Sequence, residues 1–385
     1  MINALGTERA EIWRRALAGD TSAMQARPDL TAGGQWLVGS VDDAALPAVP
    51  DRLSRYACRN NRFTMHALQQ IETEVADIVR AVGADRVGVV MGTSTSGSRE
   101  CEAAILHEHH HGSLLPEFRY EQLELGGAAE FLVELLALGG PALSVSTACS
   151  SGARALASAR SLLELGICDA VLAGGSDSLC GLTSHGFASL KATAEGLTNP
   201  FSTNRDGLNL GEGAALFLVT RDGGGIQLLG VGETSEAHHI SSPDPEGGGA
   251  AASMREALSD ADREPADVCY LNLHGTGTRL NDSMESLAVA RVLGTETPCS
   301  STKPLVGHCL GAAGAMELGF CWLALDSASE GSVAIPPHRY DGVRDPELAD
   351  IRLVGSDATT PAGVVLSNSF GFGGNNCTLA IGAAS

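Results

Sequence analysis

The 385-residue sequence lacks the long apolar runs that mark membrane proteins and secretory signals. No run reaches about 18 consecutive apolar residues, the length that a bilayer-spanning helix needs. The first twenty residues already carry Glu8, Glu11, Arg14 and Arg15, so they do not form the uninterrupted apolar segment of a secretory signal. We therefore expect a cytoplasmic protein that does not span a membrane.

Cysteine pairs and basic charge are also scarce. The ten cysteines include no CxxC pair and no regular spacing, which favours reduced thiols over a disulfide framework or a structural zinc site. The formal net charge is −21, whereas nucleic-acid binding needs a basic face. No P-loop and no dinucleotide fingerprint occurs. We expect no nucleic-acid partner.

The sequence does contain an alternation of strand-like and helix-like segments, which predicts an α/β fold in layers. A glycine-rich break at 221–225 separates two similar halves, predicted at 1–225 and 226–385. Helices are expected at 153–165 and 250–258. Strands are expected at 86–91, 141–145, 170–173, 214–220, 226–231, 268–273 and, as the last strand, 363–366.

Cys149 stands where the expected strand 141–145 meets the expected helix 153–165, within the run TACSSG. Backbone N–H groups and the positive end of a helix dipole favour a thiolate at such a position. A small buried cysteine is the alternative interpretation. The pattern thus predicts a nucleophile activated by a helix N-terminus, and segments further along the chain decide between the two interpretations.

Three later segments repeat the pattern of a strand end followed by small residues. They are HGTGT from His274, STKPLVGHCLGAAGAME from Ser301, and NSFGFGGNN from Asn368. Side chains at strand ends can project into one cleft. We expect these segments to share a cleft with Cys149.

With NPFSTNRDGLNLGEGAA at 199–215, these motifs resemble the β-ketoacyl-[acyl carrier protein] synthases of the thiolase superfamily, in order and over nearly the whole chain. The resemblance implies a thiolase-like fold with two pseudo-symmetric halves in α-β-α-β-α layers. It implies an acyltransferase that condenses an acyl group held on Cys149 with malonyl-acyl carrier protein, giving 3-oxoacyl-acyl carrier protein and CO₂ in fatty-acid, polyene or polyketide synthesis. It implies no cofactor and no metal, since the phosphopantetheine arm of the carrier protein brings the substrates.

The resemblance also carries over residue by residue. His274 and His308 match the pair that binds the malonyl thioester oxygen and stabilises the enolate, and Lys303 matches a lysine beside them. The backbone N–H groups of Cys149 and Phe372 would form a second oxyanion hole. Phe372 would also gate access to the thiol, because the glycines around it let that loop move.

Neighbouring polar residues are expected to orient or neutralise these groups: Asp282, Glu285, Thr276 and Thr278. For the two carboxylates a purely structural role is equally open. A histidine at 308 favours the elongating Cys-His-His branch, since initiating ketosynthases and plant-type polyketide synthases resemble Cys-His-Asn sites. Biosynthetic thiolases use a second cysteine near the C-terminus, but Cys377 lacks that context and is expected to be structural.

Two competing motifs are weaker. The segment 107–111 (HEHHH) contains the HExxH pattern of zinc proteases, with Glu108 as the base. Glycine and proline follow closely, so we expect a short helix without a third ligand, on an exposed segment or a subunit contact. Ser300 and Lys303 fit the SxxK pattern of penicillin-binding enzymes, but no KTG follows.

The partners are expected to be acyl carrier protein and a second subunit. Four arginines, whose spacing predicts one helix face, are the expected docking site for the acidic carrier protein: Arg52, Arg55, Arg59 and Arg62. A solvated helix face is the alternative. The chain is expected to form a homodimer, or a heterodimer with a homologous non-catalytic subunit of the kind that lacks the cysteine.

Two departures from the family pattern stand out. The strand that usually precedes the segment resembling 2–6 is missing, which leaves the edge of the N-terminal sheet undetermined. The turn at 92–97 is unusually rich in hydroxyl groups. Together with HEHHH, this turn favours a branch in specialised metabolism, such as polyene assembly.

Overall fold

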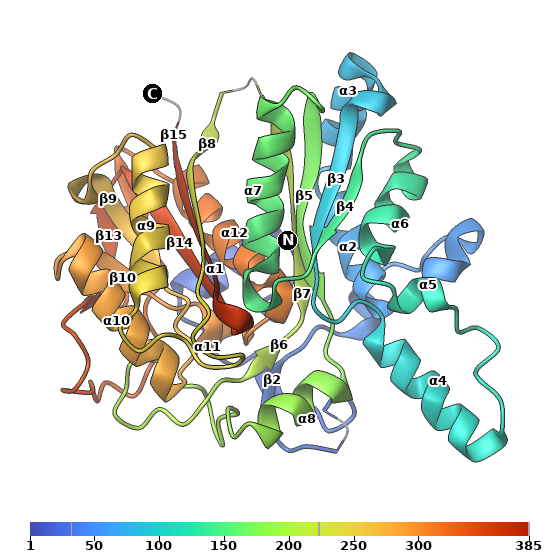
Figure 1. The fold of residues 1–385 in the computed structure, drawn as a ribbon, viewed down its shortest axis with the longest axis horizontal. Coiled ribbons are helices and arrows are strands. Elements are labelled where there is room, and N and C mark those ends of the chain that lie inside the picture. Colours follow the sequence, from blue (N-terminus) through green and yellow to red (C-terminus); the bar gives the residue numbers. More distant parts are fainter. Residues whose placement is uncertain (32, 222–223, 384–385) are drawn as a thin grey trace.

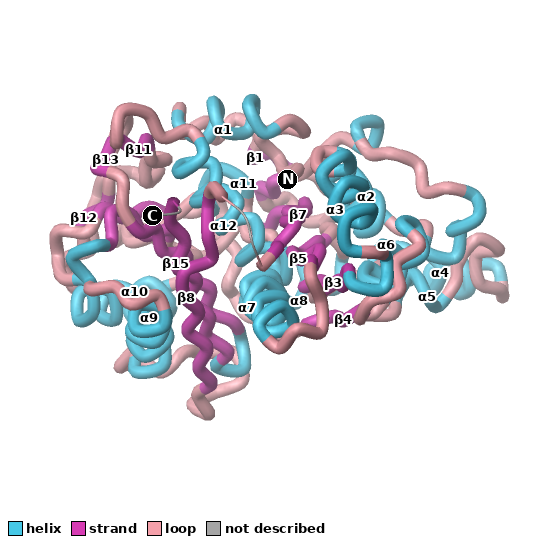
Figure 2. Tube along the Cα trace, turned by 90° about the horizontal axis from the view of Figure 1, so that it is seen from above, coloured by secondary structure: helices cyan, strands magenta, loops and turns pink. Residues whose placement is uncertain are grey.

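The computed structural model describes residues 1–31, 33–221 and 224–383. Two α/β halves lie side by side, and five layers of secondary structure run across them (Figures 1 and 2). The expected layered α/β fold is therefore confirmed. The sequence break at 221–225 falls partly on residues outside the described ranges, so the exact boundary between the halves stays a prediction.

The N-terminal half is built on a four-stranded sheet of order β4-β3-β5-β7. Its strands are β3 (Val87–Gly92), β4 (Ala142–Val145), β5 (Ala170–Asp177) and β7 (Gly213–Thr220). β3 runs parallel to β4 and β5, and β7 runs antiparallel to β5. The outer layer contains α2 (Arg59–Gln69), α3 (Glu72–Val82) and α6 (Gly127–Leu136).

The C-terminal half is built on a six-stranded sheet of order β12-β10-β9-β14-β15-β8. Its strands are β8 (Ile226–Ser235), β9 (Val268–Asn272), β10 (Pro298–Ser300), β12 (Arg352–Leu353), β14 (Val364–Gly371) and β15 (Asn375–Ala383). Its outer helices are α9 (Gly248–Asp260) and α10 (Arg279–Leu293). The prediction that 363–366 is the last strand is wrong, because β15 follows it and pairs with both β14 and β8.

The two sheets repeat one topology. The order β4-β3-β5-β7 recurs as β10-β9-β14-β15, with the first three strands parallel and the fourth antiparallel in each set. The helices α7 (Ser151–Glu164) and α12 (Ala313–Asp326) form the layer between the two sheets (Figure 2). The halves are therefore pseudo-symmetric, with Cys149 just before α7 and His308 just before α12.

Small residues let α7 and α12 approach each other closely near their N-termini. A Cβ atom on Gly152 would lie 2.8 Å from the backbone nitrogen of Ala315. A Cβ atom on Gly314 would lie 2.8 Å from the backbone nitrogen of Ala153. Any larger side chain at either glycine would push the helices apart. The small residues of both sequence motifs thus bring the two helix N-termini together.

The remaining elements flank this framework. They are α1 (Arg9–Leu17), α4 (Ser98–His111), α5 (Tyr120–Leu123), α8 (Gly181–Ser189), α11 (Lys303–Val306), β1 (Met24–Ala26), β2 (Leu37–Gly39), β6 (Leu210–Gly211), β11 (Ser332–Ala334) and β13 (Thr359–Pro361). Next to β7, the first residues contribute a single antiparallel bridge between Ile2 and Ala214. In the described ranges, no helix combines the length and the apolar character needed to cross a bilayer.

Candidate active site

Cys149 lies in a short turn between β4 and α7 and is 6% exposed. Hydroxyl groups hold this turn: Ser151 Oγ accepts from the backbone N–H of Thr147 at 2.9 Å and donates to the carbonyl of Ala148 at 2.5 Å. Ala148 has a φ of +53°, which is strained for a residue with a Cβ. The serine-rich sequence around the cysteine therefore fixes a tight turn that points the thiol away from the strand.

Two imidazoles from the C-terminal half meet this thiol. His308 lies in the turn before α12, and its Nε2 is 3.0 Å from Cys149 Sγ. His274 follows β9, and its ring lies perpendicular to that of His308 at 5.4 Å between centroids. Both histidines are buried, at 2% and 1% exposure. The structure thus brings together the three residues that the sequence motifs predicted to share a cleft.

Lys303 fixes the orientation of His274. Its Nζ donates to the His274 carbonyl and to Glu317 Oε1, and lies 3.3 Å from His274 Nδ1. A lysine ammonium has only donors, so Nδ1 must accept. The proton of the neutral His274 ring is therefore on Nε2, on the other side of the ring from Lys303. The lysine thereby makes His274 an N–H donor.

His308 is held less tightly. In the described part of the chain, its Nδ1 has no hydrogen-bond partner. The pKa values of both histidines lie well below the usual value, because burial disfavours their charged forms and Lys303 adds a positive charge nearby. Both imidazoles are therefore neutral at pH 7, and only His274 has its tautomer fixed by a partner.

The thiol is not the thiolate that the helix N-terminus alone would favour. Burial raises the pKa of Cys149 to about 11, and the opposing effects of Lys303 and of the Phe372 backbone N–H do not offset it. The expectation of a nucleophile activated by the helix dipole is corrected in this respect. At neutral pH Cys149 rests as a thiol, with His308 as the nearby group that can accept its proton.

Glu285 holds the backbone beside His274. Its carboxylate oxygens accept from the N–H groups of His274 and Gly275, each at 2.7 Å. Burial raises the pKa of Glu285 to about 7. Glu285 thus holds the loop after β9 through its backbone, and a part in the reaction stays a prediction.

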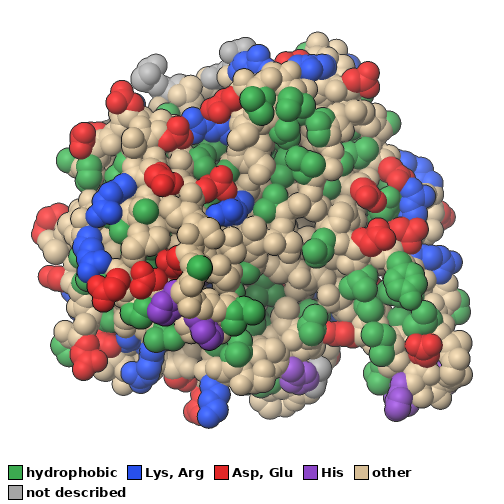
Figure 3. Space-filling view, in the orientation of Figure 1, with side chains coloured by type: hydrophobic (Ala, Val, Ile, Leu, Met, Phe, Trp, Pro, Cys, Tyr) green, Lys and Arg blue, Asp and Glu red, His purple; other side chains and the backbone are tan. Residues whose placement is uncertain are grey.

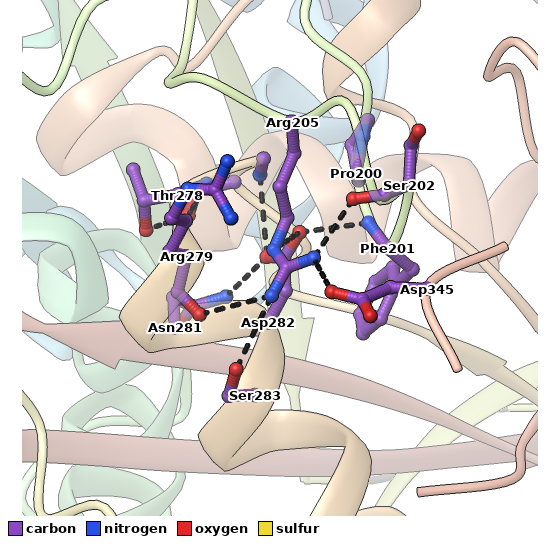
Figure 4. Close-up of polar contacts among 12 residues, drawn as sticks. Pro200, Phe201, Ser202, Arg205, Thr278, Arg279, Asn281, Asp282, Ser283 and Asp345 are labelled. Carbon is purple, nitrogen blue, oxygen red and sulfur yellow. Dashed lines mark hydrogen bonds and ion pairs between the residues drawn. The ribbon is translucent and has the colours of Figure 1, made fainter. Parts of the chain in front are cut away.

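Asp282 holds the same loop from the other side. It accepts from the N–H of Phe201 at 2.8 Å and of Gly277 at 3.2 Å, and it lies 3.9 Å from the guanidinium of Arg205. Figure 4 shows Arg205 lying between Asp282 and Asp345, its second carboxylate partner. This buried network ties the 199–206 segment to the start of α10, so the cation that Asp282 neutralises is Arg205.

The thiol and both imidazoles line a cavity of about 360 Å³. Thr276 and Thr278 also line it, and their hydroxyls lie 2.9 Å apart. Figure 3 shows hydrophobic side chains gathered in a hollow near the lower middle of the face viewed. Phe372 lines the same cavity at 36% exposure, and its ring lies 5.6 Å from that of Phe187 on α8. Its backbone N–H is hydrogen-bonded to Cys149.

Two buried carboxylates near the site received no role from the sequence: Glu317, at the end of the STKPLVGHCLGAAGAME motif, and Asp177, which lies outside the motifs. Glu317 on α12 is buried and pairs with Lys303, and burial raises its pKa to about 7. Asp177, at the end of β5, is fully buried. Its carboxylate accepts from the N–H groups of Ser94 and Thr95 and, at 2.6 Å, from that of Gly311, three residues after His308. Their only signal in the sequence was an acidic residue within an otherwise apolar, small-residue run.

The same side chains also offer ligand atoms that a metal ion could use, because the thiol and the two imidazoles place theirs within 4.8 Å of one another. The neighbouring charge opposes a cation there, because the ammonium of Lys303 lies 3.3 Å from His274 Nδ1. A metal-free site stays our prediction.

The four arginines do not share one helix face, so that prediction is wrong. A 3₁₀ segment (Asp51–Tyr56) carries Arg52 and Arg55, whereas α2 begins only at Arg59. Arg59 is 4% exposed, because it pairs with the buried carboxylate of Glu212. Arg62 is half-buried and pairs with Asp43. Arg52 and Arg55 remain exposed.

The other motifs lie outside the cavity. Cys377 is fully buried within β15 and does not line it. The HEHHH segment ends α4, which projects from the body (Figure 1). The expected short helix is wrong there, because α4 runs for 14 residues and ends only at Gly112, which caps it in the left-handed conformation.

Comparison with known proteins identifies the family of the chain. Models of the N-terminal and C-terminal domains of β-ketoacyl synthases match residues 50–223 and 226–332. The chain is 29% identical to a 3-oxoacyl-[acyl-carrier-protein] synthase 2 of Staphylococcus aureus, over 98% of each chain. It is 43% identical to a ketosynthase solved in complex with its chain length factor from Xenorhabdus doucetiae, with a TM-score of 0.94 over 100% of this chain and 96% of that one. The ishigamide ketosynthase/chain length factor is 26% identical, with a TM-score of 0.84 over 100% and 97%. Because these likenesses extend over both halves and all the site motifs, the chain belongs to the β-ketoacyl synthase family.

Proposed function

We propose that the chain is a condensing acyltransferase that extends an acyl group held on Cys149 with malonyl-acyl carrier protein. The observation that carries this proposal is the meeting of one thiol and two neutral imidazoles in a single cavity. The relatives named as 3-oxoacyl-[acyl-carrier-protein] synthases support the carrier protein as the source of both substrates. We propose that no cofactor takes part.

Acyl transfer comes first. Cys149 Sγ attacks the thioester carbonyl, and its proton moves to His308 Nε2, 3.0 Å away. The N–H groups of Cys149 and Phe372 would stabilise the oxyanion. The carrier thiolate leaves and takes the proton back from His308. A covalent intermediate divides one difficult condensation into two easier steps.

Condensation follows once the freed carrier protein has left and a malonyl-carrier thioester has entered the cavity. The malonyl C–C bond to the carboxylate breaks, CO₂ leaves, and the electron pair forms an enolate. His274 Nε2–H would stabilise the enolate oxygen, and His308 would add a second N–H, because its Nδ1 is free to give up the ring proton. The enolate carbon attacks the acyl carbonyl, the C–S bond breaks, and the Cys149 thiolate that leaves takes up a proton from water.

The test is the intact mass of the protein after incubation with an acyl-carrier thioester. The wild type should gain one acyl mass, and Cys149→Ala should gain none. A subsequent addition of malonyl-carrier protein should remove that mass and release CO₂. No gain on the wild type, or an equal gain on Cys149→Ala, would refute the acyl-cysteine.

We also propose a homologous subunit as partner, with a heterodimer favoured by the two ketosynthases that are described together with a chain length factor. The open edge of the N-terminal sheet is the candidate contact. β4 ends its sheet, and Leu143 on it is 43% exposed. An exposed strand edge presents unpaired backbone groups to another chain.

Docking of the carrier protein is proposed at Arg52 and Arg55, the two arginines of the original set that stay exposed. The Arg55 guanidinium already pairs with Glu134 at the surface. An acidic carrier helix would have to compete with that carboxylate.

A further inference from the structure

The HEHHH segment has no part in the condensation, since none of its residues lines the catalytic cavity. It forms the last turns of α4, which projects away from the two sheets (Figure 1). We propose that His107 and His111 form a binding site for a first-row transition-metal dication such as Zn²⁺ or Ni²⁺. The site is separate from the condensing centre and does not depend on the proposed reaction.

The helix brings the two imidazoles together. His107 and His111 are four residues apart, so they lie on one face of α4. Their ring centroids are 4.5 Å apart, with an angle of 41° between the planes. A metal ion binds imidazole at about 2.0–2.1 Å from the nitrogen. The two rings are therefore near enough for one ion to contact a nitrogen of each after rotation of the side chains, without any change in the backbone.

A hydrogen bond to the carbonyl of Ser113 orients the ring of His107. His107 Nδ1 lies 2.7 Å from the carbonyl oxygen of Ser113, just after the left-handed turn at Gly112. A carbonyl can only accept, so Nδ1 carries the proton and the lone pair of the neutral ring is on Nε2. Metal-binding histidines are commonly oriented by such a hydrogen bond from the other nitrogen.

The charges around the pair favour a dication. The C-terminal end of a helix carries a partial negative charge, and both rings lie in the last two turns of α4. Glu108 is exposed between them in sequence, and in the described ranges no arginine or lysine pairs with it. Imidazole nitrogen suits Zn²⁺, Ni²⁺ and Cu²⁺, whereas Mg²⁺ and Ca²⁺ prefer oxygen.

The experiment uses untagged, chelator-treated full-length protein that carries Cys149→Ala, so that the active-site thiol contributes no ligand. Equilibrium dialysis against Ni²⁺ and Zn²⁺, with elemental analysis, measures the metal bound per chain. One ion per chain is expected, and it should be lost in His107→Gln and in His111→Gln, because a chelate needs both rings. Excess Mg²⁺ should not displace it.

The matched control is the double variant H109Q/H110Q, which removes two histidines from the same helix end. It should keep the ion. Equal binding by His107→Gln and the parent protein would overturn the proposal. Loss of the ion in H109Q/H110Q would overturn it as well, since it would indicate binding by the histidine cluster as a whole. Hydrogen exchange of the α4 amides should slow on metal addition only where the pair is intact.

Discussion

The two halves of the molecule share one topology but contribute unlike groups to the cavity. The N-terminal half supplies the thiol before α7, and the C-terminal half supplies both imidazoles and Lys303 around β9 and α12. Their sheet edges also differ. β10 is buried and covered by β12, whereas its counterpart β4 is half exposed and ends its sheet. The shared topology brings the N-termini of α7 and α12 together. The differences between the halves place the thiol and the imidazoles on different halves and leave β4 as an open sheet edge.

The largest effect should come from removing the C-terminal donor. His274→Ala should lower the rate of condensation by about 10²–10³-fold, the usual cost of one oxyanion-stabilising donor. Acyl transfer to Cys149, which uses His308 and the Phe372 N–H but not His274, should stay within a few-fold of wild type, as measured by intact mass.

The conservative variant His274→Gln keeps an N–H donor and should recover part of the condensation rate. An equal loss of acyl transfer and condensation in His274→Ala would show that the restriction of His274 to the condensation step is wrong.

The next largest effect should come from the protonation state of the Cys149 thiol. With a pKa of about 11, the thiolate fraction of Cys149 rises tenfold per pH unit below that value. The rate of Cys149 alkylation by iodoacetamide should therefore increase about 100-fold between pH 7 and pH 9. Mass mapping of the peptide that contains Cys149 measures this rate. A rate that is flat over this range would show that the helix N-terminus already produces a thiolate, as the sequence alone suggested.

Asp177 joins the halves, so its loss tests the contact between them. Asp177→Asn places an amide N–H against the backbone donors of Ser94, Thr95 and Gly311. An unsatisfied buried group costs about 1–3 kcal/mol, which urea unfolding would measure. Because Gly311 follows His308, kcat should fall more than KM rises. A variant with unchanged stability and kcat would exclude this role.

The smallest effect on the reaction rate should come from a change in β4, the open edge of the N-terminal sheet. Leu143→Lys puts a charge on β4 and should weaken assembly with a second subunit, as measured by light scattering after size-exclusion chromatography. The matched control is Leu165→Lys, at a leucine that is 73% exposed at the end of α7. Unchanged assembly by Leu143→Lys would remove β4 from the interface.

Local patterns predicted much of the framework. The expected strands at 86–91, 214–220 and 268–273 lie within a residue of β3, β7 and β9, because continuous apolar runs next to glycine turns are buried strands. The α4 helix was expected to be short, and Arg59 was expected to be exposed. The first failed because α4 begins at Ser98, well before the HEHHH segment, although the glycine after that segment does end it. The second failed because it depended on a tertiary partner, the buried carboxylate of Glu212.

The sequence by itself determined the family, predicted that Cys149, His274 and His308 share a cleft, and supplied the small residues that let the central helices meet. Only the tertiary structure decided their protonation and partners. Burial keeps the thiol protonated and the imidazoles neutral, and Lys303 fixes the tautomer of His274. These properties depend on desolvation and on contacts between segments far apart in the chain, and no local motif encodes either.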